Sequence, residues 1–292
     1  MPVTPHTLHA LVVKLTAQEG GSLPGSVGEL ANAAFYAAIQ AVDPELSARM
    51  HEADERSAFS LSPLYGYWQS PQDGNIRVSA GQPGWLRVCL LEPELFAAFT
   101  THLLTSARPT IRLGGVQFAI TEALGNPASH PWAGFTTLAD LRRLPVAERW
   151  TLEFESPTAI RWGKADNGSR RVEIFPLPRM AIAGLRSRWD KWTGESWGRD
   201  FEEWVERNVV IERVWKWQTE RFVYRGQNYT GGVGKLSWRL LDNRDSERAS
   251  HLNRLLHLAF YTGIGYKTTH GLGQVRLLAS TTPDKQRRES DE

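Results

Sequence analysis

Apolar residues recur along the chain with two different periods, which predict alternating strands and helices. Residues 8–16 are rich in apolar side chains of the β-forming kind and predict an opening strand. Residues 27–42 carry apolar side chains at spacings of 3, 4, 7 and 8, which predicts a helix with one buried stripe. Asp43 and Pro44 then suit the N-cap and first residue of a short helix that ends near His51.

The segments that follow complete a βαββαβ order and then begin a similar one. In the first half we expect strands at 58–67 and 85–91, a helix at 93–105 and a strand at 116–121. A proline-containing linker over 126–148 includes a short helical stretch at 138–143. In the second half we expect strands at 150–155, 172–175, 209–217, 221–225, 235–241 and 274–278, and helices at 180–192 and 246–261. The two similar cycles indicate a duplicated α+β fold, followed by a charged tail at 283–292 that we expect to be disordered.

Length and composition fit a globular protein of two domains. The chain has 292 residues, of which 41% are hydrophobic and 23% are charged. Its single cysteine, Cys89, excludes a disulfide framework and a structural zinc site, and we expect it to be buried on a strand. No apolar run is long enough to span a membrane and no signal peptide is recognisable, so the cytoplasm is the expected location.

Charge is distributed unevenly between the two halves. Residues 1–140 hold 7 Lys/Arg and 12 Asp/Glu, whereas residues 141–292 hold 27 and 20. A polyanion should therefore dock mainly on the second half, although solvated charged faces remain the alternative. Nine of the twelve tryptophans fall from Trp150 onward. Aromatic planes stack on the bases of single-stranded RNA, but we expect most of these tryptophans to lie in the core.

A glycine-rich loop between the last predicted helix and the last predicted strand is the most informative segment. It contains two Gly-x-Gly pairs around a lysine and a histidine, namely Gly263, Gly265, Lys267, His270, Gly271 and Gly273. Such a loop can direct backbone N–H groups at an anion. It is not a dinucleotide fingerprint, which follows a strand and opens a helix, and no P-loop motif occurs in the chain. A tight helix-to-strand turn without ligand remains the alternative.

This loop resembles the signature of the CRISPR-associated repeat-cleaving endoribonucleases of the RAMP superfamily. The resemblance covers most of the chain and is specific at the loop and at the segment preceding residues 59–63. It implies two tandem ferredoxin-like domains, with catalytic residues in 1–125, a linker at 126–148 and an RNA-binding domain at 149–282. It also implies metal-independent cleavage of precursor transcripts into guide RNAs by 2′-hydroxyl attack, which leaves 2′,3′-cyclic phosphate and 5′-hydroxyl ends, without a cofactor. Repeat RNA is the implied partner; effector-complex subunits and a second copy of the chain are further candidates.

Tyr36 and His51 are the candidate catalytic pair. Tyr36 lies nearly opposite the apolar stripe of its helix, on a polar face with Glu29, Asn32 and Gln40, so we expect its ring to meet water or a ligand. Histidine is a common general acid or base, and transesterification needs one group to accept the 2′-hydroxyl proton and another to protonate the departing 5′ oxygen. By themselves, an exposed tyrosine and a surface histidine are often inert. The resemblance implies that these two residues are catalytic.

The third catalytic position departs from the family pattern. The family has a lysine there, but no lysine occurs between Lys14 and Lys164, and Arg56 is the cation at hand. Arg56 could stabilise charge on the phosphorane but could not donate a proton. Metal catalysis has little support, because the histidines are not at ligand spacing and the carboxylates near His51 lack the spacing of a metal-binding loop. Ser60 and Ser62 lack the motif of a serine nucleophile.

Basic residues of the second half complete the candidate RNA-binding set. With the six loop residues, the set contains Arg170, Arg171, Arg179 and Lys235. Two other readings remain open. One is a non-catalytic RNA-binding subunit of the same superfamily, which would have no reason to keep Tyr36 with His51. The other is a nucleotide-binding enzyme that uses the glycine-rich loop, although no magnesium-binding carboxylate lies near that loop in sequence.

Overall fold

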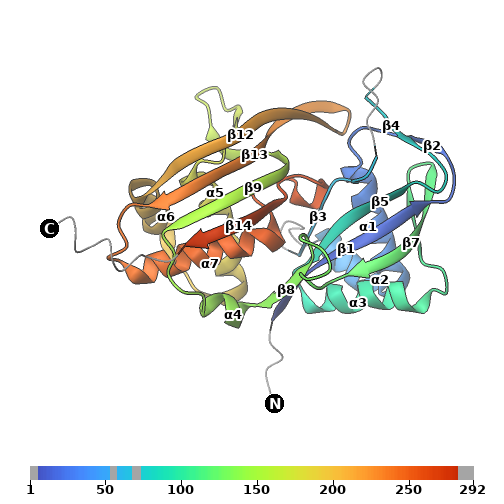
Figure 1. The fold of residues 1–292 in the computed structure, drawn as a ribbon, viewed down its shortest axis with the longest axis horizontal. Coiled ribbons are helices and arrows are strands. Elements are labelled where there is room, and N and C mark those ends of the chain that lie inside the picture. The colour runs from blue at the N-terminus through green and yellow to red at the C-terminus, as the bar shows by residue number, and fades with distance from the viewer. Residues whose placement is uncertain (1–5, 53–57, 68–73, 282–292) are drawn as a thin grey trace, which may run out of the picture.

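The structure is a computed structural model that describes residues 6–52, 58–67 and 74–281. Two large antiparallel sheets lie side by side, each with helices on one face (Figure 1), and the described residues also form two smaller, two-stranded sheets. The first half contains β1 (Thr7–Ala17), β2 (Gly21–Leu23), α1 (Gly28–Val42), α2 (Pro44–Glu52), β3 (Phe59–Leu61), β4 (Ile76–Val78), β5 (Pro83–Leu90), α3 (Pro93–Thr105), β6 (Thr110–Leu113), β7 (Val116–Leu124), β8 (Gly134–Thr137) and α4 (Leu138–Arg142). The second half contains β9 (Arg149–Thr158), β10 (Ile160–Lys164), β11 (Arg170–Glu173), α5 (Pro178–Thr193), α6 (Gly198–Asn208), β12 (Val209–Tyr224), β13 (Gln227–Leu240), α7 (Ser246–Thr262), a 3-10 turn (Thr268–His270) and β14 (Val275–Thr281).

Both sheets have the ferredoxin-like strand order. The first runs β3-β5-β1-β7-β6, and the second runs β12-β13-β9-β14. When β6 is set aside, each sheet places its first strand between its third and its last, with two helical crossovers on the same face. The predicted α+β fold with two tandem ferredoxin-like domains is therefore confirmed. None of the described helices is long and apolar enough to cross a bilayer.

The start of α2 follows the predicted capping pattern. The Asp43 carboxylate accepts a hydrogen bond from the Leu46 N–H at 2.8 Å, and Pro44 opens the helix. Such a cap satisfies a backbone donor that has no partner inside the helix, and proline is tolerated there because its missing N–H is not needed. The cap therefore determines where α2 starts after α1, and His51 falls in its last turn.

Two hydrophobic cores lie between the sheets and their helices, and they share a boundary. Trp150, Trp189 and Trp238 are fully buried in the second core, as expected for most tryptophans of this half. Cys89 is also fully buried, on β5, as predicted. It packs with residues of β1 and β5 into the core of the second domain rather than that of the first. The two domains are thus joined by continuous apolar packing.

Some predicted strands differ from those observed. The strand expected over 58–67 shortens to β3 with an isolated bridge at Tyr65, because the Ser62 hydroxyl accepts the Arg87 N–H at 2.7 Å and Pro63 has no N–H to donate. The two strands expected at 209–217 and 221–225 form one long strand, β12, paired with β13 along its length. The segment expected as a linker contributes β8, which pairs with β1.

Candidate active site and nucleic-acid interface

The rings of Tyr36 and His51 are stacked, with centroids 4.2 Å apart and planes inclined by 15°. Tyr36 extends from α1 and His51 from the last turn of α2, so the packing of these two helices sets their geometry. On another side, the Phe59 ring of β3 meets the Tyr36 ring edge-on at 5.8 Å. His51 itself is exposed and can exchange protons with solvent or a bound substrate. The structure therefore brings the two predicted catalytic side chains into direct contact.

The expectation that the Tyr36 ring meets water was wrong. Tyr36 is only 6% exposed and belongs to the first core. The helical stripe alone did not show this, because α1 is covered on two sides. The sheet covers the apolar stripe, while α2, through Leu46 and Met50, covers the side that carries Tyr36. What reaches the surface at this point is the His51 ring stacked on it.

The N-terminal part of the polar face of α1 contacts the second domain. The Asn32 side-chain amide donates to the backbone oxygen of Thr269 at 3.1 Å, one helical turn before Tyr36. The Glu29 carboxylate accepts the N–H of Arg225, at the tip of the β12–β13 hairpin, at 2.8 Å. Beside it, the Ser26 hydroxyl accepts the N–H of Val223 at 2.7 Å. The polar face thus contacts both the glycine-rich loop and the hairpin tip.

The glycine-rich loop is largely buried in the interface between the two domains. Its N–H groups include those of Ile264, Tyr266 and Gly273, which donate to backbone oxygens of the second domain at 2.9–3.1 Å. These donors are not directed at a ligand site. A Cβ on Gly28 at the start of α1 would lie 1.8 Å from the His270 oxygen, so only glycine allows the helix to approach the loop this closely. Sequence reasoning missed Gly28, and the spacing of a lone glycine before a helix gives little signal.

Lys267 and His270, the two basic residues between the glycine pairs, have different environments. Burial, and then the nearby Lys267 ammonium, lower the pKa of His270 to about 4, so its ring is neutral near pH 7. Its Nδ1 lies 2.9 Å from the Thr269 hydroxyl oxygen. Lys267 has a left-handed backbone (φ 59°), and its Nζ lies 2.7 Å from the centroid of the Tyr224 ring. Positive charge at this loop therefore comes from Lys267.

Aromatic residues that sequence reasoning did not single out surround Lys267. Tyr224 and Tyr229 come from the β12–β13 hairpin, and Tyr266 from the loop itself. The Arg161 guanidinium of β10 lies 4.7 Å from the centroid of the Tyr266 ring. We call these three tyrosines the tyrosine cluster. Tyr266 lies between two glycines of the loop, which was the available signal, whereas Arg161 becomes notable only once β10 is placed next to it.

The predicted basic residues do not form one surface. Arg170 and Arg171 lie exposed on β11, and Arg179 at the start of α5 pairs with Glu206. Lys235 lies on β13, on the helix-free face of the second sheet, with its Nζ 3.6 Å from a Glu153 carboxylate oxygen. Arg56 lies outside the described residues.

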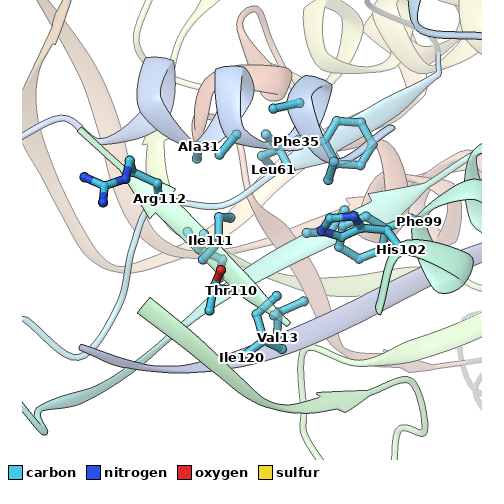
Figure 2. Close-up of a pocket in the computed structure, with 15 residues that line it drawn as sticks. Val13, Ala31, Phe35, Leu61, Phe99, His102, Thr110, Ile111, Arg112 and Ile120 are labelled. Carbon is cyan, nitrogen blue, oxygen red and sulfur yellow. The ribbon is translucent and has the colours of Figure 1, made fainter. Parts of the chain in front are cut away.

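An apolar cavity of about 190 Å³ lies under α1, but it does not include the stacked pair (Figure 2). Four alanines of the helix face it, and Phe99, Ile111 and Ile120 line its other walls. Figure 2 shows the His102 ring beside Phe99 at one end and Arg112 at the other. Small side chains on the helix explain the unfilled space. In the described ranges, no three potential metal-ligating side chains of the His, Cys, Asp or Glu type gather at one point.

Comparison with known proteins identifies the family. Residues 5–143 match the model of the CRISPR Cas6 N-terminal domain, and residues 152–275 match that of the CRISPR-associated endoribonuclease Cas6. The chain belongs to the Cas6 family. It is therefore an RNA-cleaving enzyme of the CRISPR system, and the resemblance seen in the sequence is confirmed.

Solved Cas6 structures share the fold over almost the whole chain. The product complex of Cas6 (TTHB231) is 26% identical, with a TM-score of 0.77, and covers 94% of this chain and 100% of that chain. The product complex of Cas6 (TTHA0078) has the same identity and coverage, with a TM-score of 0.71. Thermus thermophilus Cas6 (TTHB231) is 25% identical over the same shares, with a TM-score of 0.68. No curated protein matches the chain.

Proposed function

We propose that this Cas6 chain binds the repeat RNA of a CRISPR precursor transcript and cleaves it by metal-independent transesterification. The attacking group is the 2′-hydroxyl next to the scissile phosphate, and the products carry a 2′,3′-cyclic phosphate and a 5′-hydroxyl. The observation that carries the proposal is the stacking of Tyr36 on an exposed His51, with Tyr36 on a helix that contacts the glycine-rich loop through Asn32. Structural relatives described as product and substrate-mimic complexes of Cas6 support it.

His51 is the proposed general acid or base, and Tyr36 its support. The imidazole is exposed and sits on the last turn of a capped helix, so it can reach a substrate atom without being desolvated. The buried Tyr36 ring provides a flat, fixed surface that restricts the rotation of the imidazole. Arg56 is the proposed source of positive charge for the phosphorane, the role for which the family uses a lysine.

The proposed RNA path runs over the tyrosine cluster towards this pair. Lys267 and Arg161 supply charge for phosphates beside the half-buried tyrosine rings, which can stack on bases, and Arg170 on β11 is a further proposed phosphate contact. A neutral His270 offers a hydrogen bond rather than a charge. The hairpin tip ends at α1, so an RNA strand on this surface would be led to the start of the catalytic helix.

The experiment is cleavage of the host's repeat RNA in excess chelator. We expect cutting to persist, with cyclic phosphate and 5′-hydroxyl ends, because the nucleophile belongs to the RNA. A single 2′-deoxy substitution 5′ of the scissile phosphate should abolish cutting and leave binding unchanged. Cleavage of the deoxy substrate, or activity that is lost in chelator and restored by magnesium, would overturn the mechanism. Binding without any cleavage would favour the non-catalytic RNA-binding subunit.

A further inference from the structure

A buried polar connection joins the glycine-rich loop to the strand that supports Tyr36. Gln274, directly after the loop, and Arg87 on β5 are each only 1% exposed. The Gln274 side-chain oxygen accepts from Arg87 Nη1 at 2.7 Å, and its nitrogen donates to the backbone oxygen of Leu61 at 2.9 Å. The oxygen and the nitrogen of the Gln274 side-chain amide therefore both form hydrogen bonds that connect the second domain with β3 and β5 of the first.

Arg87 lies at the centre of this domain interface, where its guanidinium donates hydrogen bonds to neutral oxygens. Its Nε donates to the backbone oxygen of Trp132 at 2.8 Å, and its Nη2 to that of Phe260 at 2.6 Å. Its guanidinium also lies 4.1 Å from the centroid of the Phe260 ring. A buried donor left without an acceptor costs about 1–3 kcal/mol, and more for a charged group. The free energy of the folded protein is therefore lowest in the arrangement in which the Gln274 side-chain oxygen accepts a hydrogen bond from Arg87.

The strand β3 carries this constraint to the active site. Phe59 touches the Tyr36 ring, while the next residue, Ser60, donates through its hydroxyl to the backbone oxygen of Tyr261 at 2.8 Å. Leu61 receives the Gln274 amide, and Gly271 packs against the backbone of Pro63. Consecutive residues of one short segment thus contact the catalytic tyrosine and then the glycine-rich loop.

We propose that Gln274, clamped by Arg87, is a positioning residue that determines which phosphodiester of the bound RNA faces Tyr36 and His51. It acts through β3 and does not touch the substrate. The inference rests on the proposed function, because it assumes that RNA held at the loop is cut at the stacked pair. A displacement of about 1 Å between a bound substrate and its catalytic groups can reduce the rate about a hundredfold. A less rigid domain interface should therefore change both the cleavage rate and the position of the cut.

The test compares Gln274→Ala and Gln274→Glu with a matched control, Asn253→Ala. Asn253 is also 1% exposed and uses both ends of its amide, accepting from Trp150 at 2.8 Å and donating to the Pro145 oxygen at 2.7 Å. Its contacts lie away from β3 and the glycine-rich loop. Gln274→Glu keeps an acceptor for Arg87 but cannot donate to Leu61, so it removes one of the two side-chain contacts, and circular dichroism establishes that each variant is folded before its cleavage is compared. All three variants should bind repeat RNA within threefold of wild type.

The readouts are the single-turnover rate at saturating RNA and the cut positions at nucleotide resolution. We expect both Gln274 variants to lose about tenfold to a hundredfold in rate and to cut at neighbouring phosphodiesters. Asn253→Ala should lower only the melting temperature. A single unshifted cut in Gln274→Glu, at the rate of the Asn253→Ala control, would overturn the proposal.

A second measurement keeps this test separate from the proposed function. Spin labels at Leu104→Cys and Leu241→Cys, two exposed sites on different domains, report the distribution of interdomain distances, while the buried Cys89 stays unlabelled. Gln274→Glu should broaden this distribution and Asn253→Ala should not. If wild type does not cleave RNA at all, the proposed function fails. If wild type cleaves but Gln274→Glu leaves the distance distribution unchanged, the positioning role alone fails.

Discussion

At the scale of single residues, the chemistry depends on one exposed imidazole stacked on one buried phenol. His51→Ala removes the proposed proton-transfer group and leaves the helix that carries it. Because a general acid or base contributes roughly two to four orders of magnitude, we expect cleavage to fall by that factor and RNA affinity to change little. Single-turnover kinetics and a binding titration measure the two effects separately.

Arg49→Ala is the matched control for His51→Ala. Arg49 lies on the same helix and pairs with Glu94 on α3 at 2.6 Å, with both side chains mostly exposed. Exposed ion pairs contribute only up to about 1 kcal/mol, so this variant should fold and cleave like wild type. His51→Ala cutting within tenfold of wild type would remove His51 from the mechanism.

A second histidine should control acid stability. His251 is fully buried, stacked on Trp197 at 4.1 Å, and neither ring nitrogen has a hydrogen-bond partner among the described residues. Burial first, and then the charge of Arg254, lower the pKa of His251 to about 3, despite the opposing effect of Glu195. The folded state therefore keeps the ring neutral, whereas the unfolded chain binds a proton near pH 6.5. Stability is thus greatest above about pH 6.5 and is lost as pH falls towards 3.

His251→Phe keeps an aromatic ring in this position and removes the titrating group. We expect a higher melting temperature at pH 7, because two unpartnered polar atoms leave the core. We also expect a shallower loss of stability between pH 6.5 and 4. Denaturant unfolding at several pH values measures this; equal slopes for wild type and variant would show that His251 does not carry the acid sensitivity.

At the scale of elements, the active site depends on how closely α1 approaches the glycine-rich loop. Gly28→Ala places a Cβ where the His270 oxygen now lies, so the loop or the helix must move. We expect lower stability and weaker RNA binding, measured by thermal unfolding and titration. Gly184→Ala in α5 is the control, because its Cβ would meet nothing within 4 Å and should stabilise the helix by about 0.5–1 kcal/mol. If the two variants behave alike, the close approach at Gly28 is unimportant.

The periodicity of the sequence predicted the elements that have regular apolar stripes and capping residues. It failed for features that depend on contacts between elements far apart in the sequence. The stripe of α1 and the Asp43 cap of α2 are local features and were predicted. The burial of Tyr36 depends on α2 folding back over α1, which no local pattern shows. The helix α6 was missed, since charged residues dominate its sequence and its buried face is narrow. The pairing of Arg161 with Tyr266 requires β10 to be placed beside a loop about a hundred residues away.

At the scale of the whole molecule, the basic residues of the second half are divided between two sheets. Arg170 lies on β11, in the two-stranded sheet with β10 that also carries Arg161, whereas Lys235 lies on the open, helix-free face of the second sheet beside Glu153. Arg170→Ala should therefore reduce the slope of log affinity against log salt by about one unit. Lys235→Ala should leave that slope unchanged. A loss of slope in the Lys235 variant would place RNA on the open face instead.

The shared core between the domains has a consequence for synthesis. Leu8, Ala10 and Cys89 belong to the first domain in sequence but pack in the core of the second, and Arg87 takes two of its acceptors from residues 260 and 274. A ribosome completes β1 and β5 long before it reaches α7. Until then, these apolar side chains of the nascent first domain stay exposed, and the Arg87 guanidinium lacks the two acceptors. Because exposed apolar surface promotes aggregation, a fragment ending at residue 143 should aggregate rather than fold alone.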